Sequence, residues 1–104
     1  LLLVASDSPY PEPLHATRPL PDNFGTALVL APARDARTLA ELTIALRPAP
    51  CAPDACADAS LEALRGAIPA ARALPLLAAL ARPRTAARLV IEALPRLRLQ
   101  IDLA

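Results

Sequence analysis

Proline places the strongest limit on what this chain can fold into. The 104 residues include 13 prolines and two glycines. Because proline fixes φ and lacks a backbone donor, it interrupts helices and central strands. Five prolines fall between Ser6 and Asn23, which predicts an extended loop there. The scarcity of glycine argues against flexible linkers, so we expect a single domain over residues 1–104 with short elements and stiff connections.

Two apolar runs flank that loop, and both predict strands. Leu1–Ala5 is an uninterrupted apolar run, the pattern of a strand that is covered on both faces. Phe24–Ala31 is a second apolar run, and Pro32 ends it. The first run is therefore expected to be a buried strand that leaves its sheet at Ser6.

Three later segments also predict strands. Leu39–Arg47 alternates with a period of two, which gives one face a more apolar character. A turn over Ala33–Thr38 precedes it. Arg88–Leu94 and Leu97–Leu103 are β-like runs separated by Pro95-Arg96. Because leucine and isoleucine alternate with polar residues in the last run, this pair predicts a terminal hairpin.

Helical spacing begins after Pro48–Asp58, which we expect to be a loop. Ser60 has the character of an N-cap, and the apolar residues after it recur at helical intervals. Helices are expected over about Ser60–Ile68 and Pro75–Ala81, since proline is tolerated in a first turn. The segment Arg82–Thr85 then closes the helical region.

Charge and composition exclude several classes of partner. Eleven arginines against ten acidic residues give a net charge of +1, and the basic residues form no block. This balance provides no electrostatic footprint for a nucleic acid or for a membrane surface. No apolar stretch reaches 18 residues without a charge or a proline, and no signal-peptide pattern is present. We therefore expect a cytoplasmic protein whose core is built from Leu, Val, Ile and Ala.

The chain contains no methionine. Translation products begin with methionine, and chain termini usually lie at a surface rather than inside a buried strand. We therefore expect this chain to be a processed or partial polypeptide.

Cys51 and Cys56 are the first candidates for chemistry. A zinc site would need two further Cys or His ligands, and His15 is the only histidine. A disulfide across so short a loop would be reduced in the cytoplasm. The favoured interpretation is a pair of incidental thiols, with a disulfide or a metal site as alternatives.

The remaining titratable candidates also have simple structural interpretations. His15 lies in the proline-rich loop without a nucleophile in recognisable context, so a surface or loop-packing role is favoured over general-base catalysis. Asp7 and Glu12 follow the first strand, where α/β proteins place ligands, but they are also typical of solvated loops. Glu62 and Glu92 are interpreted as surface charges. No catalytic, cofactor-binding or metal-binding residue is assigned.

The stretches Leu1–Leu14 and Phe24–Pro32 carry a resemblance. The first reads LLLVASDSPYPEPL and the second FGTALVLAP. Together they resemble the second half of the β-ketoacyl-synthase-like N-terminal domain family, relatives of 3-oxoacyl-(acyl-carrier-protein) synthases. The spacing of Asp7, Pro9 and Pro11-Glu12-Pro13 carries the resemblance, which covers about Leu1–Pro48.

The resemblance implies an α/β, thiolase-like half-fold with a mixed sheet, packed helices and a terminal hairpin. Leu1–Ala5 would be a central strand, with Phe24–Ala31 and Leu39–Leu46 as its neighbours. The nucleophile elbow would lie in the upstream half of the same protein, and His15 does not match a family histidine. No catalytic residue or cofactor is therefore carried over to this chain.

The implied function is a role in fatty-acid-like or polyketide (aryl polyene) biosynthesis. The resemblance favours a non-catalytic partner, similar to a chain-length factor, that pairs with a ketosynthase subunit and works with an acyl carrier protein. A fragment of an active condensing enzyme is one alternative. A small α+β protein-interaction module, with the resemblance a coincidence of composition, is the other.

Overall fold

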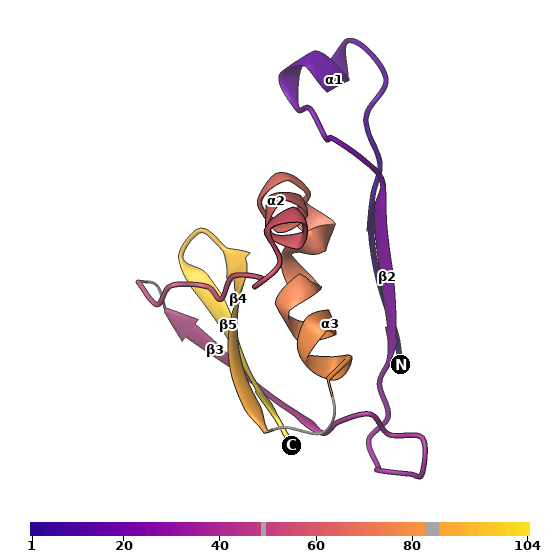
Figure 1. Cartoon of the computed structure of the whole chain (residues 1–104), viewed down its shortest axis with the longest axis vertical. Coiled ribbons are helices and arrows are strands. Elements are labelled where there is room, and N and C mark those ends of the chain that lie inside the picture. The colour runs from indigo at the N-terminus through magenta and orange to yellow at the C-terminus, as the bar shows by residue number, and fades with distance from the viewer. Residues whose placement is uncertain (49, 83–85) are drawn as a thin grey trace.

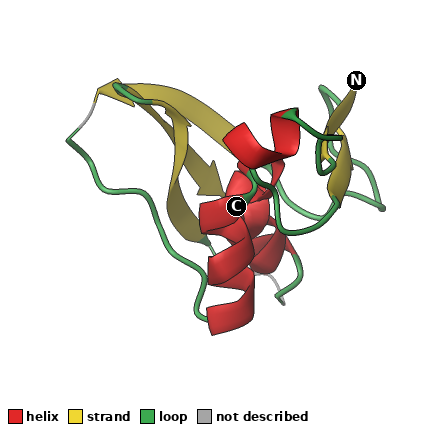
Figure 2. Ribbon diagram, turned by 90° about the horizontal axis from the view of Figure 1, so that it is seen from above, coloured by secondary structure: helices red, strands yellow, loops and turns green. Residues whose placement is uncertain are grey.

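A computed structural model of the chain describes residues 1–48, 50–82 and 86–104. The fold is mixed α/β with two small antiparallel sheets and a few helices. Two views at right angles show three layers: a long two-stranded ribbon, a layer of helices, and a three-stranded sheet (Figures 1 and 2). The ribbon continues beyond the helices into a protruding loop, so the molecule measures 47 × 31 × 25 Å.

The helices and strands follow one another as β1 (Leu2–Asp7), α1 (Leu14–Thr17), β2 (Phe24–Val29), β3 (Leu42–Pro48), α2 (Ala59–Ala67), the 3₁₀ helix η1 (Pro69–Ala73), α3 (Leu74–Leu80), β4 (Ala87–Leu94) and β5 (Leu97–Leu103). Strands β1 and β2 form the ribbon, and the second sheet has the order β3-β5-β4. The expected hairpin of the last two strands is confirmed, with Ile101 opposite Leu89.

The three-stranded sheet has one apolar and one polar face, as its period of two predicts. On the central strand β5, Ile101 and Leu103 are buried, whereas Gln100 and Asp102 point to the other side. The apolar side packs against Leu76 of α3, which is 5% exposed. Alternation along β5 therefore decides which face of the sheet the helices cover.

The helical layer begins at a cap that differs from the expected one. Asp58, rather than Ser60, caps α2: its Oδ1 accepts from the backbone N–H groups of Ser60 and Leu61 at 2.9 and 3.0 Å. Asp58 keeps an extended backbone, which an N-cap requires, while Ser60 already lies inside the helix. The prolines at the starts of η1 and α3 occupy first-turn positions, where their missing N–H groups cost nothing.

The ribbon corrects two expectations about the first strand. Leu1–Ala5 is not buried on both faces: Leu2 and Val4 are 62% and 59% exposed, because no described element lies over the outer face of the ribbon. Nor do the first three strands share one mixed sheet. β1 pairs antiparallel with β2, whereas β3 joins the other sheet through β5, and every described pairing is antiparallel.

Two apolar clusters hold the layers together. One lies between α3 and the three-stranded sheet, and it includes Leu76, Ile91 and Ile101. The other surrounds the junction of α2 and η1, where Ile68 and Ala71 are buried and Phe24 of β2 packs against them. Phe24 thus attaches the inner side of β2 to the body.

Element boundaries differ from the expectations in a few places. The proline-rich loop contains the short helix α1, and the expected single break between the helices is filled by η1. Strand β3 begins at Leu42 rather than Leu39. The turn over Ala33–Thr38 is confirmed, with Asp35 accepting from the backbone of Arg37 at 2.8 Å. Of the expected closing segment, residues 83–85 lie outside the described residues.

Two leucines on neighbouring strands test where the core lies. Leu103→Ala on β5 removes a side chain that is 6% exposed, so we expect a loss of about 3 kcal/mol in unfolding free energy. Leu94→Ala on β4 makes the same chemical change at a site that is 57% exposed, and it should cost less than about 1 kcal/mol. Urea denaturation followed by circular dichroism measures both. Equal losses would contradict this placement of the core.

Candidate functional site

A recess lies where the ribbon meets the helical layer. It has a volume of about 230 Å³ and is lined by Asp7, Tyr10, Arg18, Pro19, Leu20, Ala67 and Pro69. The end of β1 and the loop after it form one wall, and the junction of α2 and η1 forms the other. Its volume is below the range of about 300–1,000 Å³ that is usual for small-molecule sites.

Asp7 fixes one wall of this recess to the other. Its Oδ2 accepts a hydrogen bond from the backbone N–H of Ala70 at 2.6 Å, across 63 positions of sequence. Ala70 lies in the first turn of η1, where backbone N–H groups lack helical partners. Asp7, which the sequence offered as a candidate ligand group, therefore ties the ribbon to the helices.

The other candidates of the proline-rich loop are not brought together with Asp7. Glu12 is exposed and does not line the recess. His15 lies in α1 with its side chain partly buried, and its Nδ1 is buried without a hydrogen-bond partner among the described residues. The favoured interpretation of His15 as a loop-packing residue fits this position. Asp7 and Glu12 thus do not form an acid pair.

Sequence reasoning missed the other two polar residues of the recess, Tyr10 and Arg18. Tyr10 is the only tyrosine of the chain, and Arg18 precedes Pro19. Their rarity and position in the loop were visible, but nothing in their spacing links them to Ala67 and Pro69. Only the fold of the ribbon against η1 creates this neighbourhood.

The two cysteines are separate free thiols. Cys51 is exposed and Cys56 is partly buried. Burial, followed by the nearby carboxylate of Glu62, raises the pKa of the Cys56 thiol. A raised pKa lowers the thiolate fraction at neutral pH, so Cys56 is poorly suited to act as a nucleophile.

Glu62 organises the segment around Cys56 rather than acting as an isolated surface charge. Its Oε2 accepts from the backbone N–H of Cys56 at 2.7 Å and from Nε of Arg65 at 2.8 Å. The hydrogen bond from Arg65, with that from Cys56, lowers the pKa of Glu62 to about 2. The loop before α2 is therefore pinned to the first turns of that helix.

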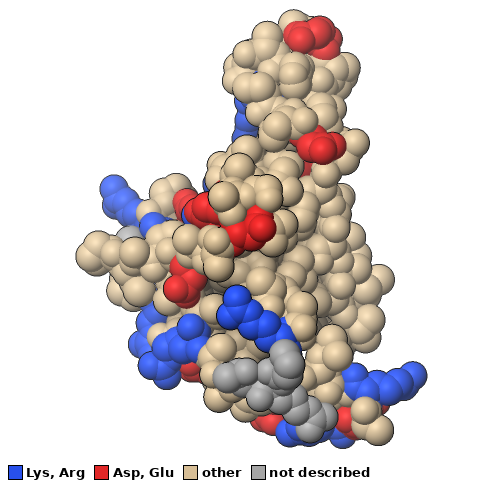
Figure 3. Space-filling model, viewed as in Figure 1, with Lys and Arg blue, Asp and Glu red and all other residues tan. Residues whose placement is uncertain are grey.

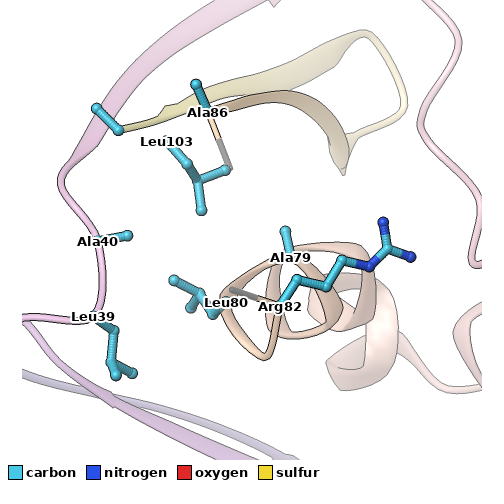
Figure 4. A pocket seen from close by; sticks show the side chains of 8 residues that line it. Leu39, Ala40, Ala79, Leu80, Arg82, Ala86 and Leu103 are labelled. Carbon is cyan, nitrogen blue, oxygen red and sulfur yellow. The ribbon is translucent and has the colours of Figure 1, made fainter. Parts of the chain in front are cut away.

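A smaller recess lies at the open end of α3, between the helix and the sheet. Figure 4 shows Leu80 and Leu103 near its centre, with Arg82 at its margin. Its volume is about 90 Å³, and its lining is otherwise made of leucine and alanine. This recess offers no group for acid, base or nucleophilic chemistry.

Charged side chains elsewhere pair across the polar face of the sheet. Arg88 Nε donates to Asp102 Oδ1 at 2.6 Å, which lowers the pKa of Asp102. Arg47 Nε donates to Gln100 at 3.0 Å. In the space-filling view, charges of both signs are interspersed over the body, whereas the ribbon side is uncharged over most of its length (Figure 3).

Residues 1–48, 50–82 and 86–104 contain no cluster of three His, Cys, Asp or Glu side chains that could hold a metal ion. Within the same ranges, no helix has the length and apolar character needed to cross a bilayer.

Comparison with protein-family models, with curated proteins and with solved structures finds no match.

The contact of Asp7 with η1 can be tested directly. Asp7→Ala removes an acceptor from a partly buried backbone N–H, so we expect a loss of about 2 kcal/mol and faster amide exchange along β1 and β2. Asp7→Asn keeps an acceptor oxygen and should lose less. Hydrogen exchange with mass spectrometry gives the readout. Unchanged exchange in Asp7→Ala would contradict the role of this contact.

The Glu62 network predicts a specific response to acid. Because the pKa of Glu62 is about 2 in the folded chain, against an ordinary value of 4.5, its stabilising contribution is complete above pH 4.5 and is lost as the pH falls toward 2. Glu62→Gln removes this contribution, so the melting temperature should fall less between pH 6 and pH 3 than in the unmodified chain. Glu12→Gln, which removes an exposed loop carboxylate, is the matched control. An identical acid response in the Glu62 and Glu12 variants would contradict the prediction.

Proposed function

We propose that this chain is part of a β-ketoacyl-synthase-like protein with a thiolase-like fold. In this proposal the protein is a non-catalytic, chain-length-factor-like partner of a ketosynthase subunit. The pair works with an acyl carrier protein in fatty-acid-like or aryl polyene biosynthesis in the cytoplasm. The upstream half of the same protein supplies the rest of the domain.

The observation that carries the proposal is the outer face of the β1–β2 ribbon. Leu2, Val4 and Val29 share this face and are 62%, 59% and 83% exposed. A two-stranded ribbon is marginally stable alone, and an exposed apolar patch marks a surface that normally contacts another element. The family resemblance implies that this segment is a central strand of a larger sheet. A central strand needs an apolar face on this side, which the rest of the domain would cover.

The exit from β1 gives a second line of support. The resemblance depends on Asp7 and the prolines that follow it, and Asp7 holds the end of β1 against η1. A residue that orders the loop after a strand has a structural reason to stand at a fixed position in a motif. The proposal thus gives the most specific part of the motif a physical role without a catalytic one.

The two other functions differ from this proposal in testable ways. An active condensing enzyme would carry a cysteine at the nucleophile elbow upstream of Leu1, with histidines downstream. A small α+β interaction module would need no upstream half, and its ribbon would remain exposed in the native protein. No described contact favours either alternative over the partner function.

Reconstitution with the full-length protein tests the proposal. We expect the full-length protein to form no acyl chain alone, to bind the ketosynthase subunit, and to be required for that subunit to extend a chain on the acyl carrier protein. Size-exclusion chromatography with light scattering and product mass spectrometry give the readouts. Chain extension by the protein alone would favour the condensing enzyme, and absence of both binding and extension would favour the interaction module.

A matched pair of lysine substitutions tests the ribbon. In the full-length protein, Val4→Lys should lower the free energy of unfolding by about 3 kcal/mol or more, because the proposal buries this face in a larger sheet. Leu94→Lys, at a site of nearly equal exposure on β4, is the control and should change stability little. Equal, small effects would contradict a buried ribbon.

A further inference from the structure

Strand β3 forms an outer edge of the three-stranded sheet, and it differs from the opposite edge. At the β4 edge, Asp54 covers the strand: its N–H donates to the carbonyl of Val90 at 2.8 Å, and its Oδ2 accepts from the N–H of Val90 at 2.6 Å. Among the described residues, β3 pairs with β5 alone. Proteins normally protect an exposed edge, because it can pair with another chain.

The hydrogen-bond pattern identifies the backbone groups that this edge presents. Glu41 and Ala104 exchange two backbone hydrogen bonds, of 2.9 and 3.0 Å, in register with the β3–β5 pair. Bonding alternates along an antiparallel ladder, so Thr43, Ala45 and Arg47 face β5. The N–H and C=O groups of the intervening residues, Leu42, Ile44 and Leu46, therefore point away from the sheet.

The same residues leave apolar surface uncovered. Ile44 and Leu46 lie on the apolar face of the sheet, opposite Ile101 and Leu99 of β5. Their partners belong to the core, whereas Ile44 and Leu46 are 54% and 65% exposed, because α3 covers the sheet only over β4 and β5 and part of β3. The edge thus combines unpaired backbone groups with exposed apolar side chains.

The sequence of this edge is complementary to itself. Residues 41–47 read Glu-Leu-Thr-Ile-Ala-Leu-Arg. Reversed, the pattern repeats: leucine faces leucine, a small residue faces a small residue, Ile44 faces itself, and the acid faces the base. We propose that β3 is a homodimerisation strand, in which two copies of the chain pair antiparallel about a two-fold axis at Ile44.

This register satisfies the backbone and the apolar side chains together. Ile44 meets Ile44 of the second copy in a hydrogen-bonded pair, and Leu42 meets Leu46 on each side, so all the outward N–H and C=O groups of these residues are paired. The two sheets become one continuous sheet of six strands with its apolar faces on the same side. Pro48, which has no N–H to donate, ends the pairing at each side.

Charge selects this register over its neighbours. Glu41 and Arg47 are both exposed and lie on the polar face, and in the proposed pairing each faces the other across the two-fold axis. A shift by two residues in either direction loses both ion pairs. Strand β1 has no comparable self-complementarity, since Asp7 at one end has no base at the other. The β3 contact goes beyond the proposed function and uses a different surface from the ribbon.

The oligomeric state of the chain in solution tests the proposal. Sedimentation equilibrium of the full chain should show a monomer–dimer equilibrium. Ile44→Lys places two ammonium groups opposite each other at the axis, so it should abolish the dimer, while circular dichroism remains unchanged because the site is exposed. Glu12→Arg, a charge change in the distant loop, should leave the dimer intact. A monomer in the unmodified chain, or a dimer that survives in Ile44→Lys, would overturn the proposal.

Charge reversal tests the register itself. Glu41→Arg and Arg47→Glu each create two like-charge contacts, so each variant alone should dissociate more readily, by about tenfold or more in Kd. When the two variants are mixed, opposite charges face each other at both positions, and a heterodimer should form with an affinity near that of the unmodified chain. Native mass spectrometry distinguishes the species. A mixture that gains no heterodimer, while both variants remain folded, would overturn this register.

Discussion

The apolar contact between α3 and the inner face of the three-stranded sheet supports the rest of the structure. Leu76 packs on Ile91 and Ile101 with almost no exposed area, and the alternation of β5 provides the face that receives it. A chain with a single phenylalanine has few large side chains to bury, so this contact and the smaller cluster around Ile68 make up the core. Among the described residues, only Leu20 and Pro75 are buried outside these two clusters.

Because the core is so small, two parts of the β-structure remain exposed. The helical layer has one side for the sheet and one side for the ribbon, and it covers only part of the inner face of each. The outer face of the ribbon and the β3 edge remain uncovered by described residues. The first surface exposes Leu2, Val4 and Val29 and supports the proposal of a larger parent domain, while the second is short, self-complementary and bordered by charges.

The polar residues serve mainly to fasten loops to this framework. Asp7 ties the ribbon to η1, Asp58 and Glu62 order the start of α2, and Asp54 covers the β4 edge. Each of these carboxylates accepts from a backbone N–H group that the secondary structure leaves without a partner. Of the acidic residues that the sequence analysis singled out, Asp7 and Glu62 therefore have structural roles, whereas Glu12 is an exposed loop charge.

The sequence by itself determined the local elements with the clearest periodicity. The alternation in Leu97–Leu103 predicted the last strand and its inward face, and Pro75 predicted the first turn of α3, because both signals act through the residues' own backbones and faces. It could not determine partners distant in sequence. Three such points depend on how few layers the chain supplies. They are whether β3 pairs with β1 or with β5, whether Asp7 contacts Glu12 or Ala70, and whether an apolar strand is covered on one face or on two. Only the tertiary structure decided these points, because burial and pairing belong to neighbouring elements rather than to a segment's own sequence.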